Sequence, residues 1–232
     1  MNNLATILRG EPQALATGAR ESGWRHTLLC VAIIIAGAGC YGAALGWWRS
    51  PQQALYTAIK CPLVMLLTAG GNALLNGMLA PLLGVNIPFR QSFSAILMSF
   101  VITAAILGGF SPILAFVIWN APPLADHSPA VTEAYGLLLM ANVLLIAFAG
   151  SVGNVHLLRL LSLFSQDRPN AAGRVLMAWL AINLFFGSQL SWMLRPFVGT
   201  PDLPVQFMRA APLSGNFYEA VFHNILRILH LN

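Results

Sequence analysis

The sequence predicts an all-α protein: a polytopic bundle of about five transmembrane helices, followed by a C-terminal amphipathic helix in the membrane interface. Hydrophobic residues make up 57% of the 232 residues and charged residues only 8%, whereas a soluble protein of this length carries about a quarter charged residues. The apolar residues collect in blocks of roughly twenty, each long enough to cross a hydrocarbon core about 30 Å thick. Nearly every charge lies between the blocks, as expected of membrane spans separated by short joints.

The apolar blocks give approximate boundaries for the spans, which we expect at 27–46, 54–79, 93–119, 134–158 and 175–194. The third block contains Gly108-Gly109 and Ser111-Pro112, and glycine and proline pairs are typical sites of helix kinks. We therefore expect this helix either to cross with a tilt or to be broken near its far end.

We expect one membrane domain at 27–195, between a surface-lying lead-in at 1–26 and a C-terminal segment at 196–232. The C-terminal segment begins with an extended, proline-rich stretch. Asn216 can then cap a helix that runs to about Leu231, with apolar residues on one side and polar residues on the other. This helix is too short to span, so it is expected to lie in the interface or to pack on the membrane domain or a neighbouring subunit.

Basic residues on the joints predict the orientation, because cytoplasmic loops are enriched in lysine and arginine. The N-terminal segment and the second and fourth joints hold seven of them (Arg9, Arg20, Arg25, Arg90, Arg159, Arg168 and Arg174). The first and third joints hold only Arg49. We expect a cytoplasmic N-terminus and a non-cytoplasmic C-terminus, although Arg195, Arg209 and Arg227 in the tail count against this orientation.

Charge and cysteine content exclude several classes of protein. The net charge of +5 comes from 12 basic and 7 acidic residues that form no run, so the basic face of a nucleic-acid-binding protein is missing. Anchoring to anionic lipid headgroups explains the basic surplus. Cys30, Cys40 and Cys61 lie in or beside apolar blocks, and their odd number argues against a disulfide framework. They have no metal-ligand spacing either.

Four asparagines inside apolar blocks are candidates for function, because polar groups are costly there. Asn72 and Asn76 are four residues apart and share one helical face, and Asn142 and Asn183 lie in the fourth and fifth blocks. They can hydrogen-bond between helices, or they can line a substrate or ion path, and both interpretations stay open. Lys60 lies one or two turns inside the second block, where its long stem can reach the interface.

Two further patterns concern helix surfaces. Gln189, Trp192 and Arg195 recur at three-residue spacing and form a polar, aromatic and basic stripe near the end of the fifth block. Arg195 can bind a lipid phosphate or a carboxylate there, or the stripe can be an ordinary interfacial anchor. Gly42 and Gly46 form a GxxxG pattern, which indicates a helix-packing face and is compatible with homo-oligomers.

No residue pattern predicts catalysis. Ser151 stands between glycines in the fourth block, but His156 is five residues further along the same helix and points to a different face. Ser188 in the fifth block has equally little support as a nucleophile. Asp126 and His127 in the third joint supply only two metal ligands, in a loop. We therefore expect no catalytic residue, no metal site and no cofactor.

The predicted topology, with five spans and a cytoplasmic N-terminus, is similar to that of the Yip family of small membrane proteins and its bacterial relatives. Residues 188–199, SQLSWMLRPFVG, also resemble the last span of some uncharacterised bacterial multispan proteins. The Yip resemblance implies membrane organisation and partner recruitment rather than catalysis. No functional residue carries over from either resemblance, and the extra amphipathic tail departs from the Yip plan.

These observations lead to a non-enzymatic scaffold or complex subunit in the inner membrane of a bacterium-like cell as the first hypothesis. Its expected partners are the bilayer with its anionic lipids, and either further copies of itself or another membrane protein. The second hypothesis is a transporter or channel subunit with an asparagine-lined polar path. A third, an intramembrane hydrolase using Ser151 or Ser188, has the weakest support. The two leading hypotheses differ in whether water reaches the asparagines.

Overall fold

The structure is a computed structural model, and it describes residues 23–82, 88–123, 128–164, 169–199 and 204–219. Five helices contain most of these residues: α3 (Trp24–Trp47), α4 (Pro51–Leu82), α5 (Phe89–Trp119), α6 (Pro129–Phe164) and α7 (Pro169–Met193). Every helix has a stretch long and apolar enough to cross a membrane. The described residues form no strand. The predicted all-α, five-span membrane fold is confirmed.

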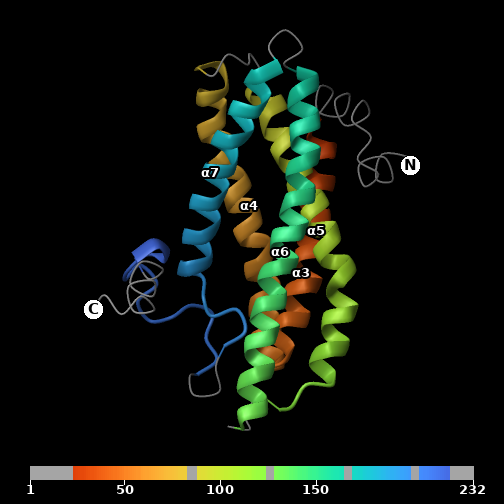
Figure 1. Ribbon diagram of the computed structural model, residues 1–232, viewed down its shortest axis with the longest axis vertical. Coiled ribbons are helices and arrows are strands. Elements are labelled where there is room, and N and C mark those ends of the chain that lie inside the picture. The colour runs from red at the N-terminus through yellow and green to blue at the C-terminus, as the bar shows by residue number, and fades with distance from the viewer. Residues whose placement is uncertain (1–22, 83–87, 124–127, 165–168, 200–203, 220–232) are drawn as a thin grey trace.

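The helices run side by side along the long axis of the molecule, with α3 packed against both α4 and α5 (Figure 1). Helix α6 packs on α5, and α7 lies against α4 and α6. The main core draws buried side chains from all five helices, including Ile34, Met98, Leu160 and Trp179. Helices α6 and α7 are the least buried, so most of their apolar surface faces outward, as expected of helices at the rim of a bundle in lipid.

Glycines let α3 approach its neighbours closely. A Cβ atom on Gly46 would lie 2.6 Å from the carbonyl oxygen of Gln53 on α4, and one on Gly42 would meet the Thr57 carbonyl. On another side of α3, a Cβ on Gly108 of α5 would lie 2.8 Å from the Cα of Gly37. Small residues bring helix backbones together in this way in membranes, where close packing replaces the hydrophobic drive.

Helix α5 continues through Pro112 without a break, so of the two alternatives for the third span the broken helix is wrong. Proline has no N–H for the carbonyl four residues earlier, which here belongs to Gly108. The Ser111 hydroxyl donates to that carbonyl oxygen at 2.6 Å. A side chain thus satisfies the backbone group that proline leaves free, which is how spanning helices tolerate proline.

The helices extend beyond the apolar blocks. Helix α3 begins at Trp24, inside the expected lead-in, and α6 begins at Pro129, five residues before the fourth block. Proline suits the first position of a helix because its missing N–H would have no intrahelical acceptor there. Residues 1–22 of the lead-in and 220–232 of the expected amphipathic helix lie outside the described residues. The described start of that helix is capped, since the Asn216 side-chain oxygen accepts from the Glu219 N–H at 2.8 Å.

Candidate functional site at the docked C-terminal segment

A polar face on the first turns of α4 forms the centre of the candidate site. Gln53, Thr57 and Lys60 follow one another at four- and three-residue spacing, so they lie on the same side of the helix. All three are 0% exposed. Buried polar groups need hydrogen-bond partners, and the neighbouring helices offer mostly apolar side chains.

The partners of this face are two backbone carbonyls just after α7. Gln53 Nε2 donates to the Pro196 oxygen at 3.0 Å and to the Phe197 oxygen at 2.7 Å. Lys60 Nζ donates to the Pro196 oxygen at 2.6 Å. The Thr57 hydroxyl lies 2.6 Å from the Phe197 oxygen and 2.9 Å from the Gln53 carbonyl oxygen, to either of which it can donate. The Pro196 and Phe197 carbonyls therefore each have two possible donors on α4.

The Lys60 ammonium ends among aromatic rings instead of reaching water. It lies 5.1 Å from the ring centroid of Phe207, 5.8 Å from that of Phe197 and 6.0 Å from that of Tyr56. Rings within about 6 Å attract a cation through their quadrupoles. Tyr56 and Phe207 also contact each other edge to face at 5.5 Å. The lysine thus joins α4 to two parts of the segment that follows α7.

The stripe on α7 holds the same segment further along the chain. The Gln189 side-chain oxygen accepts from the Phe217 N–H at 3.3 Å. The Ser188 and Tyr218 hydroxyls are 2.8 Å apart, and the Phe217 ring contacts the Trp192 ring edge to face at 6.4 Å. Two of the three stripe residues, together with Ser188, therefore contact the start of the C-terminal helix.

The third stripe residue, Arg195, lies just beyond the end of α7. Its guanidinium carbon is 3.1 Å from the ring centroid of Trp192, and the guanidinium of Arg209 is 5.2 Å from the same centroid. Burial, and then the nearby charge of Arg209, lower the pKa of Arg195 from its ordinary value. Two positive charges therefore lie beside one aromatic ring at this end of the bundle.

The asparagines fall into separate helix contacts. The Asn72 amide donates to the Asn183 side-chain oxygen, which joins α4 to α7, and Asn72 is fully buried. Asn142 on α6 accepts from the Tyr41 hydroxyl of α3 at 2.5 Å. The Asn76 side chain lies outside the described part of the structure. Asn72 and Asn183 are thus brought together, whereas Asn142 belongs to another interface.

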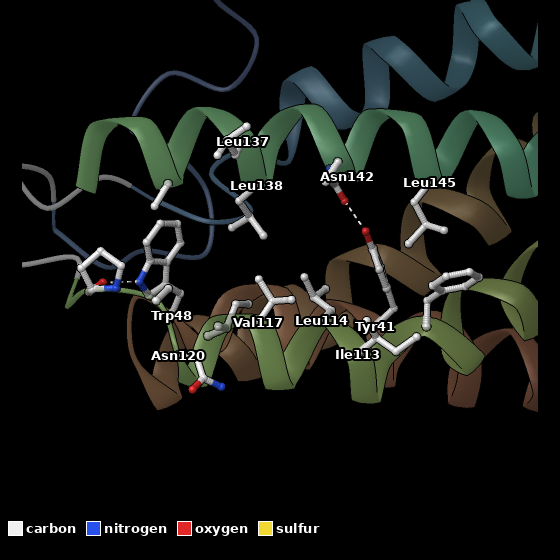
Figure 2. A pocket seen from close by; sticks show the side chains of 16 residues that line it. Tyr41, Trp48, Ile113, Leu114, Val117, Asn120, Leu137, Leu138, Asn142 and Leu145 are labelled. Atoms are coloured by element: carbon white, nitrogen blue, oxygen red, sulfur yellow. Dashed lines mark hydrogen bonds between the residues drawn. The ribbon is translucent and has the colours of Figure 1, made fainter. Parts of the chain in front are cut away.

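A cavity of about 530 Å³ lies between α5 and α6, near the same end of the bundle as the docked segment (Figure 2). Its walls are mainly apolar side chains, among them Leu114, Val117 and Leu138. The Tyr41–Asn142 hydrogen bond is part of its lining, as Figure 2 shows. Trp48 lines it as well and donates from Nε1 to the Pro122 carbonyl at 3.0 Å.

The residues considered for catalysis are not brought together. Ser151 is exposed and His156 is half-buried on α6. The Ser188 hydroxyl lies 2.5 Å from the Leu184 carbonyl and beside the Tyr218 hydroxyl. Among the described residues, no group of three or more His, Cys, Asp or Glu could hold a metal. The loop with Asp126 and His127 lies outside the described residues.

Sequence reasoning missed Gln53, Thr57 and Tyr41. The spacing of Gln53, Thr57 and Lys60 is a signal that could have found the polar face of α4, because it repeats on one side of a helix. Its partners gave no such signal, because backbone carbonyls have no signature in sequence. Tyr41 sits in an apolar block where a tyrosine is commonplace.

Protein-family models, curated proteins and solved structures contain no match to the chain. The resemblance to the Yip family therefore stays an expectation from topology.

Proposed function

We propose that this integral membrane protein is a non-enzymatic scaffold or subunit of a membrane complex, which holds its C-terminal segment at one membrane face for a partner to bind. The partner is a further copy of the chain or another membrane protein. The observation that supports this proposal most is the set of hydrogen bonds made by the polar face of α4. Gln53, Thr57 and Lys60 are fully buried, and all three contact the backbone carbonyls of the segment after α7.

Such contacts fix a segment that has little regular structure. Only the last of its described residues, from Phe217, are helical, so helix formation does little to order the chain between α7 and that point. Ordering each residue costs about 1–2 kcal/mol in backbone entropy. Hydrogen bonds from α4 at one end of the segment and from α7 at the other offset that cost. A surface ordered in advance binds a partner without losing this entropy again.

The outer side of the segment is available for a partner. Leu213 is 77% exposed, whereas Phe207 and Tyr218 of the same segment contact α4 and α7. A large apolar side chain that is exposed on a rigid support can serve as the anchor of an interface. We infer that residues 210–218 form the contact surface.

The asparagines support a scaffold over a polar path. Asn72 and Asn183 bond to each other, and Asn142 bonds to Tyr41. Amides that satisfy one another between helices serve as packing contacts, which are worth on average about 0.6 kcal/mol in membranes. A path for solutes would need these groups to face a common water-filled space.

Site-specific photo-cross-linking in intact membranes tests this function. A benzophenone amino acid at Leu213 should give a discrete protein adduct, whereas one at Leu144, which is exposed on α6, should give none or only lipid adducts. Combining the Leu213 probe with Gln53→Met and Lys60→Met should abolish the adduct while the protein still inserts. The proposal fails if Leu213 gives no protein adduct, or if the adduct persists after the segment is released.

A further inference from the structure

A pair of arginines at the end of α7 carries an inference that goes beyond the scaffold function and does not depend on it. Arg195 and Arg209 are fourteen residues apart in sequence, yet both guanidinium groups lie beside the ring of Trp192, at 3.1 and 5.2 Å from its centroid. Like charges at close range repel each other. A fold that brings them together without an anion loses stability.

Hydrogen-bond donors around this ring outnumber the acceptors. Arg195 Nε donates to the Trp192 carbonyl at 3.1 Å, and Arg209 Nη2 donates to the Ser214 carbonyl at 2.6 Å. Trp192 Nε1 and Arg209 Nε are both buried and have no hydrogen-bond partner among the described residues. Buried donors normally have an acceptor, so two in one cluster need an explanation.

Ordinary structural roles explain only part of the cluster. An arginine just after a helix favours the negative end of the helix dipole and can bond its last carbonyls, which accounts for Arg195 and its bond to Trp192. Arg209 is not at a helix end and gains nothing from that dipole. In the described part of the chain neither arginine forms an ion pair, so none of the described carboxylates neutralises them.

We propose that Arg195, Arg209 and Trp192 form a binding site for a phosphate group, supplied by an anionic phospholipid of the surrounding leaflet. Two guanidinium groups offer paired N–H donors that match phosphate oxygens. Trp192 Nε1 and Arg209 Nε are further donors in the same cluster, without a partner among the described residues. The site lies just past the end of a spanning helix, the level at which tryptophan and lipid headgroups meet. Free phosphate shares this chemistry, so the test separates the two sources.

The purified full-length protein in phosphatidylcholine nanodiscs provides the assay. Phosphatidylglycerol is added in steps to the nanodisc lipid, and in a second series inorganic phosphate is added to discs of phosphatidylcholine alone. Thermal unfolding and native mass spectrometry of the released protein report binding. The variants are Arg195→Gln, Arg209→Gln and the pair together, and the matched control is Arg174→Gln, an exposed arginine near the start of α7.

For the wild type we expect retained phosphatidylglycerol and a raised unfolding temperature, and for the double glutamine variant binding weaker by about tenfold or more. Arg174→Gln should leave both readouts unchanged. The double variant Arg195→Lys/Arg209→Lys keeps the charges without the paired donors, and it should fold and bind at an intermediate level. The same response to inorganic phosphate alone would support the site and assign it to a soluble anion.

Two results would overturn the site. One is a wild type that responds to neither phosphatidylglycerol nor phosphate. The other is a folded double glutamine variant that binds as the wild type does. Both results are independent of the scaffold function, because this assay measures lipid and phosphate binding, whereas the Leu213 cross-link does not report on lipid.

Discussion

Replacing Gln53 by methionine tests how firmly α4 holds the C-terminal segment. Methionine has nearly the same shape, so the change removes the two hydrogen bonds to the Pro196 and Phe197 carbonyls, at 3.0 and 2.7 Å, with little change in volume. Both carbonyls keep a donor, Lys60 for the first and Thr57 for the second. The variant therefore loses two neutral hydrogen bonds without leaving an unpaired carbonyl.

The expected loss follows from those two bonds. Each contributes about 0.5–1.5 kcal/mol net. The Gln53 side-chain oxygen is buried without a partner, so its removal returns part of that loss. We expect docking of the segment to weaken by about 1–2 kcal/mol, which raises the population of the released segment roughly 5- to 30-fold.

The assay is the reaction rate of a buried thiol. Val198 is 5% exposed, so a Val198→Cys probe, in a protein whose native cysteines are replaced, reacts when the segment opens. Gln53→Met should accelerate labelling roughly 5- to 30-fold, the factor worked out for opening, whereas Leu55→Met, an exposed position on α4, should not. Adding Lys60→Met leaves the Pro196 carbonyl without either donor, so the double variant should label faster than the product of the two single effects.

The proposed docking by Gln53 is refuted if Gln53→Met labels at the wild-type rate. It is equally refuted if the double variant shows only the product of the single effects, because the shared carbonyl requires the two donors to be coupled. A change in labelling that appears also with Leu55→Met would point to general destabilisation instead of release of the segment.

Three further predictions concern packing inside the bundle, each measured by unfolding in mild detergent. Asn72→Leu should destabilise the fold by about 0.6–2 kcal/mol, and with Asn183→Leu added the total loss should fall short of the sum of the two single losses, since the amides bond to each other. Gly46→Ala should cost about 1–3 kcal/mol, because its Cβ would lie 2.6 Å from a backbone oxygen; Gly150→Ala, with nothing within 4 Å, should cost nothing. Ser111→Ala should cost about 1 kcal/mol by removing the partner of the carbonyl that proline frees.

The helical fold could be predicted from sequence because its cause is local. An apolar block of sufficient length must satisfy its own backbone in lipid, and a helix does so within a single segment. The ends of the helices could be predicted less accurately than the helices themselves. Helix α6, for example, begins at Pro129, where the sequence is still polar. The Ser111 hydroxyl supports α5 where it continues through Pro112, and which carbonyl that hydroxyl bonds to is a matter of geometry.

The candidate site was predictable only in its separate parts. Lys60, Gln189, Trp192 and Arg195 stand out as polar groups at block edges. The partner of Lys60 lies far along the chain, since its bond to Pro196 spans 136 residues. Which residues meet across such separations depends on how the helices pack, and the apolar pattern of spanning helices leaves that packing open.

One condition of the scaffold function is that no common water-filled path reaches Asn72, Asn142 and Asn183. It is tested most directly by cysteine accessibility, using Asn72→Cys, Asn142→Cys and Asn183→Cys in a protein without native cysteines, with a membrane-impermeant thiol reagent. Ser214→Cys in the exposed segment serves as the labelled control. A scaffold should show protection at all three asparagine positions with the protein folded and inserted. Labelling of these positions along a common face would contradict it and favour a water-filled path for transport.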